Sequence, residues 1–170
     1  DIGIRMSTKL RKLGRFLTAE KFLKLKPVRD RAAKDPGLGV EILKLKVAEF
    51  QADRTDLLGS QNYHTLAKML DGRVQKYSTL NPAAGIRLAL VASRLHWHHG
   101  KKADQQALRP SWQALQRAVQ VAGTWADSGA EARGLRDKAA LSVLDFAEAF
   151  LDMDSCLPWE AEVRPFAVAC

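Results

Sequence analysis

The sequence is poor in cysteine and contains no long run of hydrophobic residues. Cys156 and Cys170 are the only cysteines in 170 residues, too few for the disulfide framework of a small secreted domain. The longest mainly apolar stretch, residues 86–95, is interrupted by two arginines and a serine. It is far shorter than the roughly 18 residues of a membrane span. We therefore expect an intracellular protein of a reducing compartment, without a transmembrane segment.

Signatures of enzymes are also missing. No serine lies in a Gly-x-Ser-x-Gly motif, and residues 37–39 (Gly-Leu-Gly) lack the further features of a phosphate-binding loop. Cys156 lies among acidic residues, which disfavour a reactive thiolate. The carboxylates of the second half occur where a solvated helix face would carry charges in any case. We therefore predict no catalytic residue and no cofactor.

The histidines are the weaker alternative for a functional centre. Residues 96–99 (His-Trp-His-His) hold three of the four histidines, and on a helix the three-residue spacing of His96 and His99 could hold a metal ion. Asp104 and His64 are the additional ligands that the sequence offers. However, the cluster precedes a glycine and two lysines, which indicates a helix end where imidazoles bond the last carbonyls. We predict no metal site, and keep as an alternative a metal-dependent enzyme centred on His96, His98 and His99.

Positive charge is what the chain has in excess, and it is concentrated at one end. The formal net charge is +8. Residues 5–34 hold eleven basic and two acidic side chains, a net charge of +9, whereas residues 35–170 hold 16 of each sign. This separation predicts a basic N-terminal arm on a neutral body. The cations that we expect to bind an anionic surface or a nucleic acid are Lys9, Arg11, Lys12, Arg15, Lys21, Lys24, Lys26, Arg29 and Arg31.

The arm itself has helical periodicity. Ser7 is a candidate N-cap, and the apolar stripe that follows consists of Met6, Leu10, Leu13 and Leu17. We expect a break near Thr18, because a continued helix would place Lys21 and Lys24 on this stripe. Residues 35–37 (Asp-Pro-Gly) form a turn signal, at which the arm should end. A basic amphipathic start is also typical of organelle targeting, which leaves an organelle matrix as an alternative location.

The remaining chain is also helical in pattern. Apolar residues recur every three or four positions, and the helices expected from this spacing cover residues 39–59, 60–77, 82–100, 108–122 and 128–153. Asn81-Pro82 is a typical helix start, and residues 128–131 resemble a capping box. Asp71-Gly72 lies inside the second helix and leaves a split open there, because interior glycine costs about 1 kcal/mol relative to alanine. Leu141 and Leu144 add a second apolar flank to the last helix. No segment alternates convincingly as a strand.

These patterns predict an all-α fold. We expect an antiparallel helical bundle or a short array of helical hairpins with about five to seven helices. The predicted divisions are a basic helical arm (residues 1–36), a helical body (residues 37–155) and an irregular tail (residues 156–170), in which Pro158 and Pro165 end regular structure.

The function that this organisation favours is structural. We predict a non-enzymatic scaffold subunit of a protein or ribonucleoprotein assembly, which docks through its arm on an anionic surface and has other subunits as partners. Sequence-independent RNA binding is the alternative. It is less favoured because base stacking requires aromatic residues among the cations, where only Phe16 and Phe22 occur. A membrane surface would suit the same charges, but the break near Thr18 would split the amphipathic face.

Overall fold

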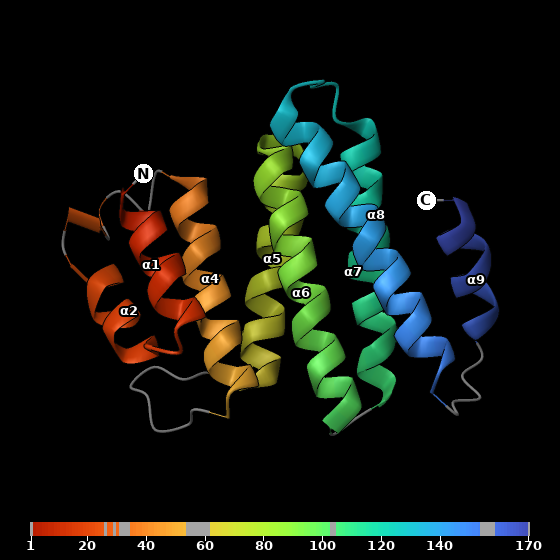
Figure 1. The fold of residues 1–170 in the computed structure, drawn as a ribbon, viewed down its shortest axis with the longest axis horizontal. Coiled ribbons are helices and arrows are strands. Elements are labelled where there is room, and N and C mark those ends of the chain that lie inside the picture. The colour runs from red at the N-terminus through yellow and green to blue at the C-terminus, as the bar shows by residue number, and fades with distance from the viewer. Residues whose placement is uncertain are drawn as a thin grey trace. The chain divides into compact units, whose positions relative to one another are not determined.

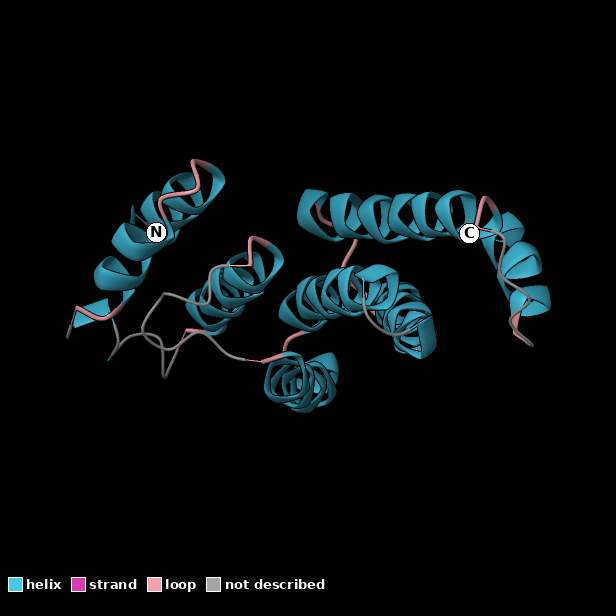
Figure 2. Ribbon diagram, turned by 90° about the horizontal axis from the view of Figure 1, so that it is seen from below, coloured by secondary structure: helices cyan, strands magenta, loops and turns pink. Residues whose placement is uncertain are grey.

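A computed structural model describes residues 2–25, 27–28, 30, 35–53, 62–102, 105–153 and 159–169. The elements are α1 (Ile2–Lys12), α2 (Phe16–Leu23), α4 (Pro36–Gln51), α5 (Tyr63–Leu80), α6 (Pro82–Lys102), the 3-10 turn η1 (Gln105–Ala107), α7 (Leu108–Thr124), α8 (Ala130–Leu151) and α9 (Glu160–Ala169) (Figure 1). None of the described residues lies in a strand (Figure 2). The predicted all-α fold is confirmed, and the eight α-helices of the described ranges slightly exceed the number expected.

The chain packs as two compact units, Asp1–Gly72 and Arg73–Cys170. The boundary falls within α5, which continues without interruption through Asp71 and Gly72, so the helix is not split at this glycine. The first unit contains both the predicted arm and α4. Packing therefore does not separate an arm from a body near residue 36.

Among the described residues, the first unit contains α1, α2, α4 and the beginning of α5. Both α1 and α2 pack on α4 and on each other. One hydrophobic cluster of the unit consists of Ala19, Leu23, Leu38 and Leu45, surrounded by Ile4, Leu10, Phe16, Phe22, Val28 and Ile42. The N-terminal segment is therefore a folded part of this unit and contributes two of the four buried residues of this cluster.

The break between α1 and α2 lies earlier than expected. Gly14 adopts a left-handed conformation with φ of 69°. The N–H of Arg15 donates to the carbonyl of Leu10 over 2.9 Å, and the N–H of Gly14 to that of Arg11 over 3.0 Å. These bonds form a Schellman motif, which ends α1 at a residue that tolerates positive φ. The break is thus at residues 13–15 instead of near Thr18.

The predicted N-cap at Ser7 is also wrong, because α1 begins at Ile2 and Ser7 is fully buried inside it.

The turn signal before α4 has a different role from the one expected. The side chain of Asp35 accepts hydrogen bonds from the N–H groups of Gly37 (2.8 Å) and Leu38 (3.4 Å), with Pro36 in the first helical position. The predicted turn is therefore the N-terminal cap of α4.

Replacing Asp35 with Ala should lower the free energy of unfolding by about 1 kcal/mol, because two N–H groups at the start of α4 lose their acceptor. Asp35→Asn is the matched control, since asparagine caps helices about as well. Urea unfolding followed by circular dichroism at the helical band gives both values. Equal midpoints for Asp35→Ala and the wild type would contradict this role.

The second unit is built around α6, α7 and α8, which run antiparallel in sequence order (Figure 1). The most extensive helix contact is between α6 and α7. There the buried Ser111 hydroxyl donates to the carbonyl of Ser93 over 2.8 Å. The two helices also approach closely near their connection, since a Cβ on Gly100 would lie 2.6 Å from the Leu108 side chain. Glycine at this position is therefore a packing requirement.

Helix starts in the second unit follow the sequence signals in one case and not in the other. Asn81 accepts a hydrogen bond from the N–H of Ala84 over 3.0 Å, with Pro82 first in α6, so the expected start is confirmed. The capping box before α8 is not formed. Gly129 occupies the N-cap position, and no side chain caps the helix by a hydrogen bond. Glu131 Oε1 instead lies 2.5 Å from Nη2 of Arg87. The glutamate therefore forms an ion pair with a cation of α6 and does not cap its own helix.

One side of α8 differs from the expectation at two positions. Leu141 and Leu144 are 60% and 46% exposed. The second buried flank predicted for this helix is therefore absent, and two leucines lie on its exposed side.

The C-terminal segment is helical where an irregular tail was predicted, so that prediction is wrong for residues 160–169. The helix α9 contains Pro165 in its interior, which normally disfavours helix. Aromatic packing opposes this cost: Trp159 stacks on Phe150 with ring centroids 4.6 Å apart, and Phe166 packs against Trp112 at 5.1 Å. Pro158 and the expected helix end at Gly59 lie outside the described residues.

Candidate anionic-surface interface

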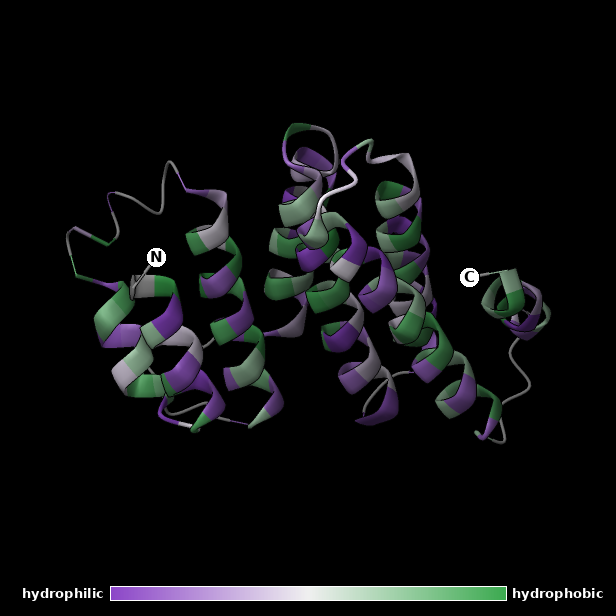
Figure 3. Cartoon of the chain, turned by 45° about the horizontal axis from the view of Figure 1, so that its top comes forward, coloured by the Kyte–Doolittle hydropathy of each residue, from purple (hydrophilic) through white to green (hydrophobic). Residues whose placement is uncertain are grey.

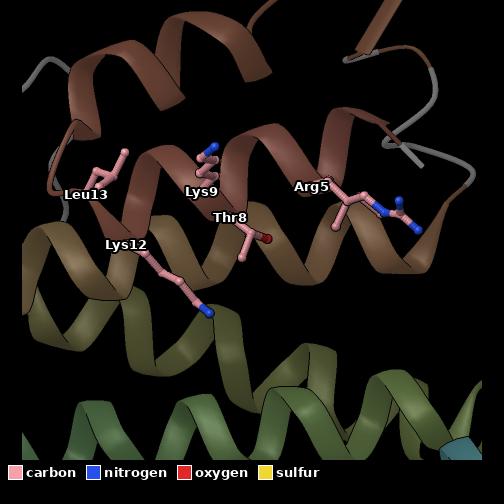
Figure 4. Close-up of a pocket in the computed structure, with 6 residues that line it drawn as sticks. Arg5, Thr8, Lys9, Lys12 and Leu13 are labelled. Atoms are coloured by element: carbon pink, nitrogen blue, oxygen red, sulfur yellow. The ribbon is translucent and has the colours of Figure 1, made fainter.

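One side of α1 carries a row of cations. Arg5, Lys9 and Lys12 are spaced by four and three residues, which places them along one side of the helix, and all three are exposed. Together with Ile4, Thr8 and Leu13 they line an open pocket of about 380 Å³ (Figure 4). The pocket therefore combines fixed positive charge with apolar wall.

Exposed hydrophobic residues lie among these cations. Met6 is 46% and Leu13 63% exposed, and both lie within one helical turn of Lys9. We call the set Arg5, Met6, Lys9, Lys12 and Leu13 the α1 face. Hydrophobic and hydrophilic segments interleave along α1 and α2 (Figure 3).

The predicted apolar stripe of the arm is therefore not its buried side. Of its four residues, only Leu10 is half-buried, and Leu17 on α2 is 45% exposed. Ser7 and Ile4, which share the Leu10 side of α1, are turned toward the interior instead. The apolar residues of the stripe are consequently available at the surface.

Arg11 has a different environment from the other cations of α1. Its Nε donates to Oε1 of Glu41 on α4 over 3.0 Å, and the Glu41 side chain is only 2% exposed. Lys44 Nζ lies 3.9 Å from the other carboxylate oxygen. This ion pair, in which Glu41 is the buried partner, attaches α1 to α4, so Arg11 contributes to the packing of the unit.

The α2 helix adds further charge. Leu17, Lys21 and Lys24 lie on one side at spacings of four and three residues, and all three are exposed. Lys24 Nζ is 2.7 Å from Oε1 of Glu20, which partly neutralises it. Arg15, between the two helices, is also exposed.

The structure thus separates the nine cations predicted as a site. Five are exposed, namely Lys9, Lys12, Arg15, Lys21 and Lys24. Arg11 is paired inside the unit, and Lys26, Arg29 and Arg31 lie outside the described residues. Arg5 was counted among the cations of the arm but not among the nine predicted to bind, and it lies on the α1 face beside Lys9. Its four-residue spacing to Lys9 is the signal that would have found it.

The histidine cluster does not form a metal centre in the described part of the chain. His96 is 3% exposed, and His98 and His99 are half-buried near the end of α6. No group of three or more potential ligands is close enough to hold a metal ion among the described residues. His64 belongs to the first unit, and Asp104 lies outside the residues described.

The aromatic residues of the N-terminal segment face inward. Phe16 and Phe22 are both partly buried against the core of the first unit. A base-stacking surface needs exposed rings beside the cations. The arrangement of these two residues therefore disfavours a dedicated site for single-stranded nucleic acid on α1 and α2.

Comparisons of the chain with models of known protein families, with curated proteins and with solved structures found no match. Among the described helices, none has the length and hydrophobicity needed to span a membrane.

Proposed function

We propose that this protein is a non-enzymatic helical subunit of a larger assembly, and that it docks through the α1 face on an acidic surface of a partner protein. The observation that carries the proposal is the row of three exposed cations interleaved with two exposed hydrophobic side chains. The cations would steer and orient the partner. Burial of Met6 and Leu13 would add the hydrophobic part of the binding free energy.

The hydrophobic share of the α1 face favours a protein over RNA. Against a phosphate backbone, the Met6 and Leu13 side chains would gain little, since most contacts to a nucleic acid backbone are polar or ionic. Against a protein surface, both can be removed from water at about 25 cal/mol per Å² of apolar area. The inward position of Phe16 and Phe22 supports the same choice.

The test compares partners captured by the tagged full-length chain from native extract, in nuclease-treated and untreated halves. The variant is Lys9→Glu/Lys12→Glu. The matched control is Lys68→Glu/Arg73→Glu, which makes the same change of net charge at two exposed residues of α5. We expect nuclease-resistant partners whose recovery falls about tenfold with the α1 variant, equivalent to about 1.4 kcal/mol, and is unchanged with the control.

Two results would overturn the proposal. Partners lost on nuclease treatment would make RNA the bridge and establish the alternative function. Recovery that is equal for the α1 variant and the α5 control would show that the α1 face does not dock. Far-ultraviolet circular dichroism of both variants checks that the helices are retained.

A further inference from the structure

The exposed side of α8 is acidic and carries two leucines. Asp145, Glu148 and Asp152 follow each other at spacings of three and four residues, along one side of the helix and its C-cap. Leu141 and Leu144 lie on the same side and are 60% and 46% exposed. We call these five residues the α8 face. Asp137 and Lys138, also exposed, lie at its N-terminal end.

The opposite side of α8 packs against the other helices of the second unit. Ala139, Val143, Phe146 and Phe150 are buried where α8 packs on α6, α7 and α9. Large exposed hydrophobic side chains in a group are typical of interaction surfaces, whereas single ones need no explanation. The α8 face is therefore complementary to a surface that presents cations and apolar side chains.

Such a partner surface exists on the same chain. The α1 face has three exposed cations and two exposed hydrophobic residues. The wider segments show the same polarity: residues 5–34 carry a net charge of +9, and residues 137–162 hold seven acidic and one basic side chain, a net charge of −6. Every copy of the protein therefore offers one basic and one acidic surface.

The two rows also match in spacing. Arg5, Lys9 and Lys12 are separated by four and three residues, and Asp152, Glu148 and Asp145, taken in the reverse direction, have the same intervals. Two antiparallel helices therefore bring the three cations opposite the three carboxylates at once, because the rise per residue is equal in both. The same alignment sets Leu13 opposite Leu144.

We infer that the α8 face binds the α1 face of a second copy of this chain, with the two helices antiparallel. Lys12 then pairs with Asp145, and Lys9 with Glu148. Because the two surfaces differ, the contact is head-to-tail, and it generates a ring or a filament according to the rotation between successive copies. This inference rests on the proposed function of the α1 face and adds the identity of its partner.

The experiment measures self-association of the purified full-length protein by sedimentation velocity over a range of concentrations. The wild type should form oligomers that weaken as salt is added, since the pairing is ionic. Lys9→Glu/Lys12→Glu and Asp145→Lys/Glu148→Lys should each raise the dissociation constant about tenfold or more. Lys68→Glu/Arg73→Glu, with the same charge change outside both faces, should associate like the wild type.

Mixing the two reversed variants gives the decisive readout. Each has faces of like charge and should stay monomeric alone at a concentration at which the wild type associates, whereas an equimolar mixture restores opposite charges at every contact and should associate again. A loss caused by misfolding would not be rescued in this way. A wild type that is monomeric at all concentrations, or a mixture that stays monomeric, overturns the inference. Capture of another protein through Lys9 and Lys12 would survive either result, so the proposed function can stand when self-association fails.

Discussion

Replacing Arg11 with Met should lower the free energy of unfolding of the first unit by about 3 kcal/mol, the lower end of the cost of removing one partner from a buried ion pair, because Arg11 itself is 20% exposed. The guanidinium contacts a Glu41 carboxylate whose side chain is 2% exposed, and Lys44 is 3.9 Å away. Without Arg11, the carboxylate is left buried with only this distant partner. Methionine keeps much of the apolar stem, so the loss reports the charge and its hydrogen bond.

The matched control is Lys12→Met, which removes an exposed cation from the same helix and should change the stability of the monomer by no more than about 0.5 kcal/mol. Circular dichroism reports both units during urea unfolding, whereas all four tryptophans lie in the second unit. The shift should therefore appear in the dichroism. Arg11→Met/Glu41→Leu should recover most of the loss, since replacing both partners by apolar groups is often nearly neutral. A midpoint for Arg11→Met equal to that of Lys12→Met would refute the structural role.

This ion pair also shows why the candidate site could be predicted only in part. The cations of the first 34 residues stand out in the sequence, and their number needs no structure. Which of them are exposed depends on contacts that the local pattern does not contain, because the acid that pairs with Arg11 is thirty residues away. The same holds for Arg5, whose place on the α1 face depends on a helix that begins at Ile2.

The buried side of α1 could not be predicted from its apolar stripe alone. Met6 and Leu13 of the predicted stripe are exposed, whereas Leu10 of the same stripe lies on the inward side with Ile4 and the small Ser7. A short helix with charges on several sides offers more than one orientation, and the tertiary contact with Glu41 favours this one. Periodicity indicated that this segment is helical, but it did not determine which side of the helix packs inward.

Longer helices with clear end signals were easier to predict. The cap at Asn81 and the continuous apolar pattern that follows it predicted α6 closely. The glycine at position 72 did not interrupt α5, since the cost of an interior glycine is only about 1 kcal/mol and buried Leu66, Leu70 and Val74 support this helix on both sides of it. Tertiary packing also overrides the proline of α9.

Replacing Phe150 with Ala should destabilise the second unit by about 3–5 kcal/mol, the range for removing a large aromatic side chain from a core. Phe150 is fully buried and lies between two other rings. Its ring centroid is 5.5 Å from that of Phe146 and 4.6 Å from that of Trp159, and both pairs are stacked. Because Trp159 directly precedes α9, the loss of its partner should also release that helix from α8. Exchange of the amide hydrogens of residues 160–169 should then accelerate more than that of α6.

Leu144→Ala is the matched control, because it shortens an exposed side chain on the same helix. It should leave the free energy of unfolding of the monomer within about 0.5 kcal/mol of the wild-type value. Tryptophan fluorescence follows the transition in both variants, and hydrogen exchange separates local release of α9 from global unfolding. Uniform acceleration across α6 and α9 in Phe150→Ala would mean that α9 does not open separately. Unchanged exchange in α9 together with an unchanged midpoint would mean that the stacked rings do not hold it, and that Pro165 is tolerated for another reason.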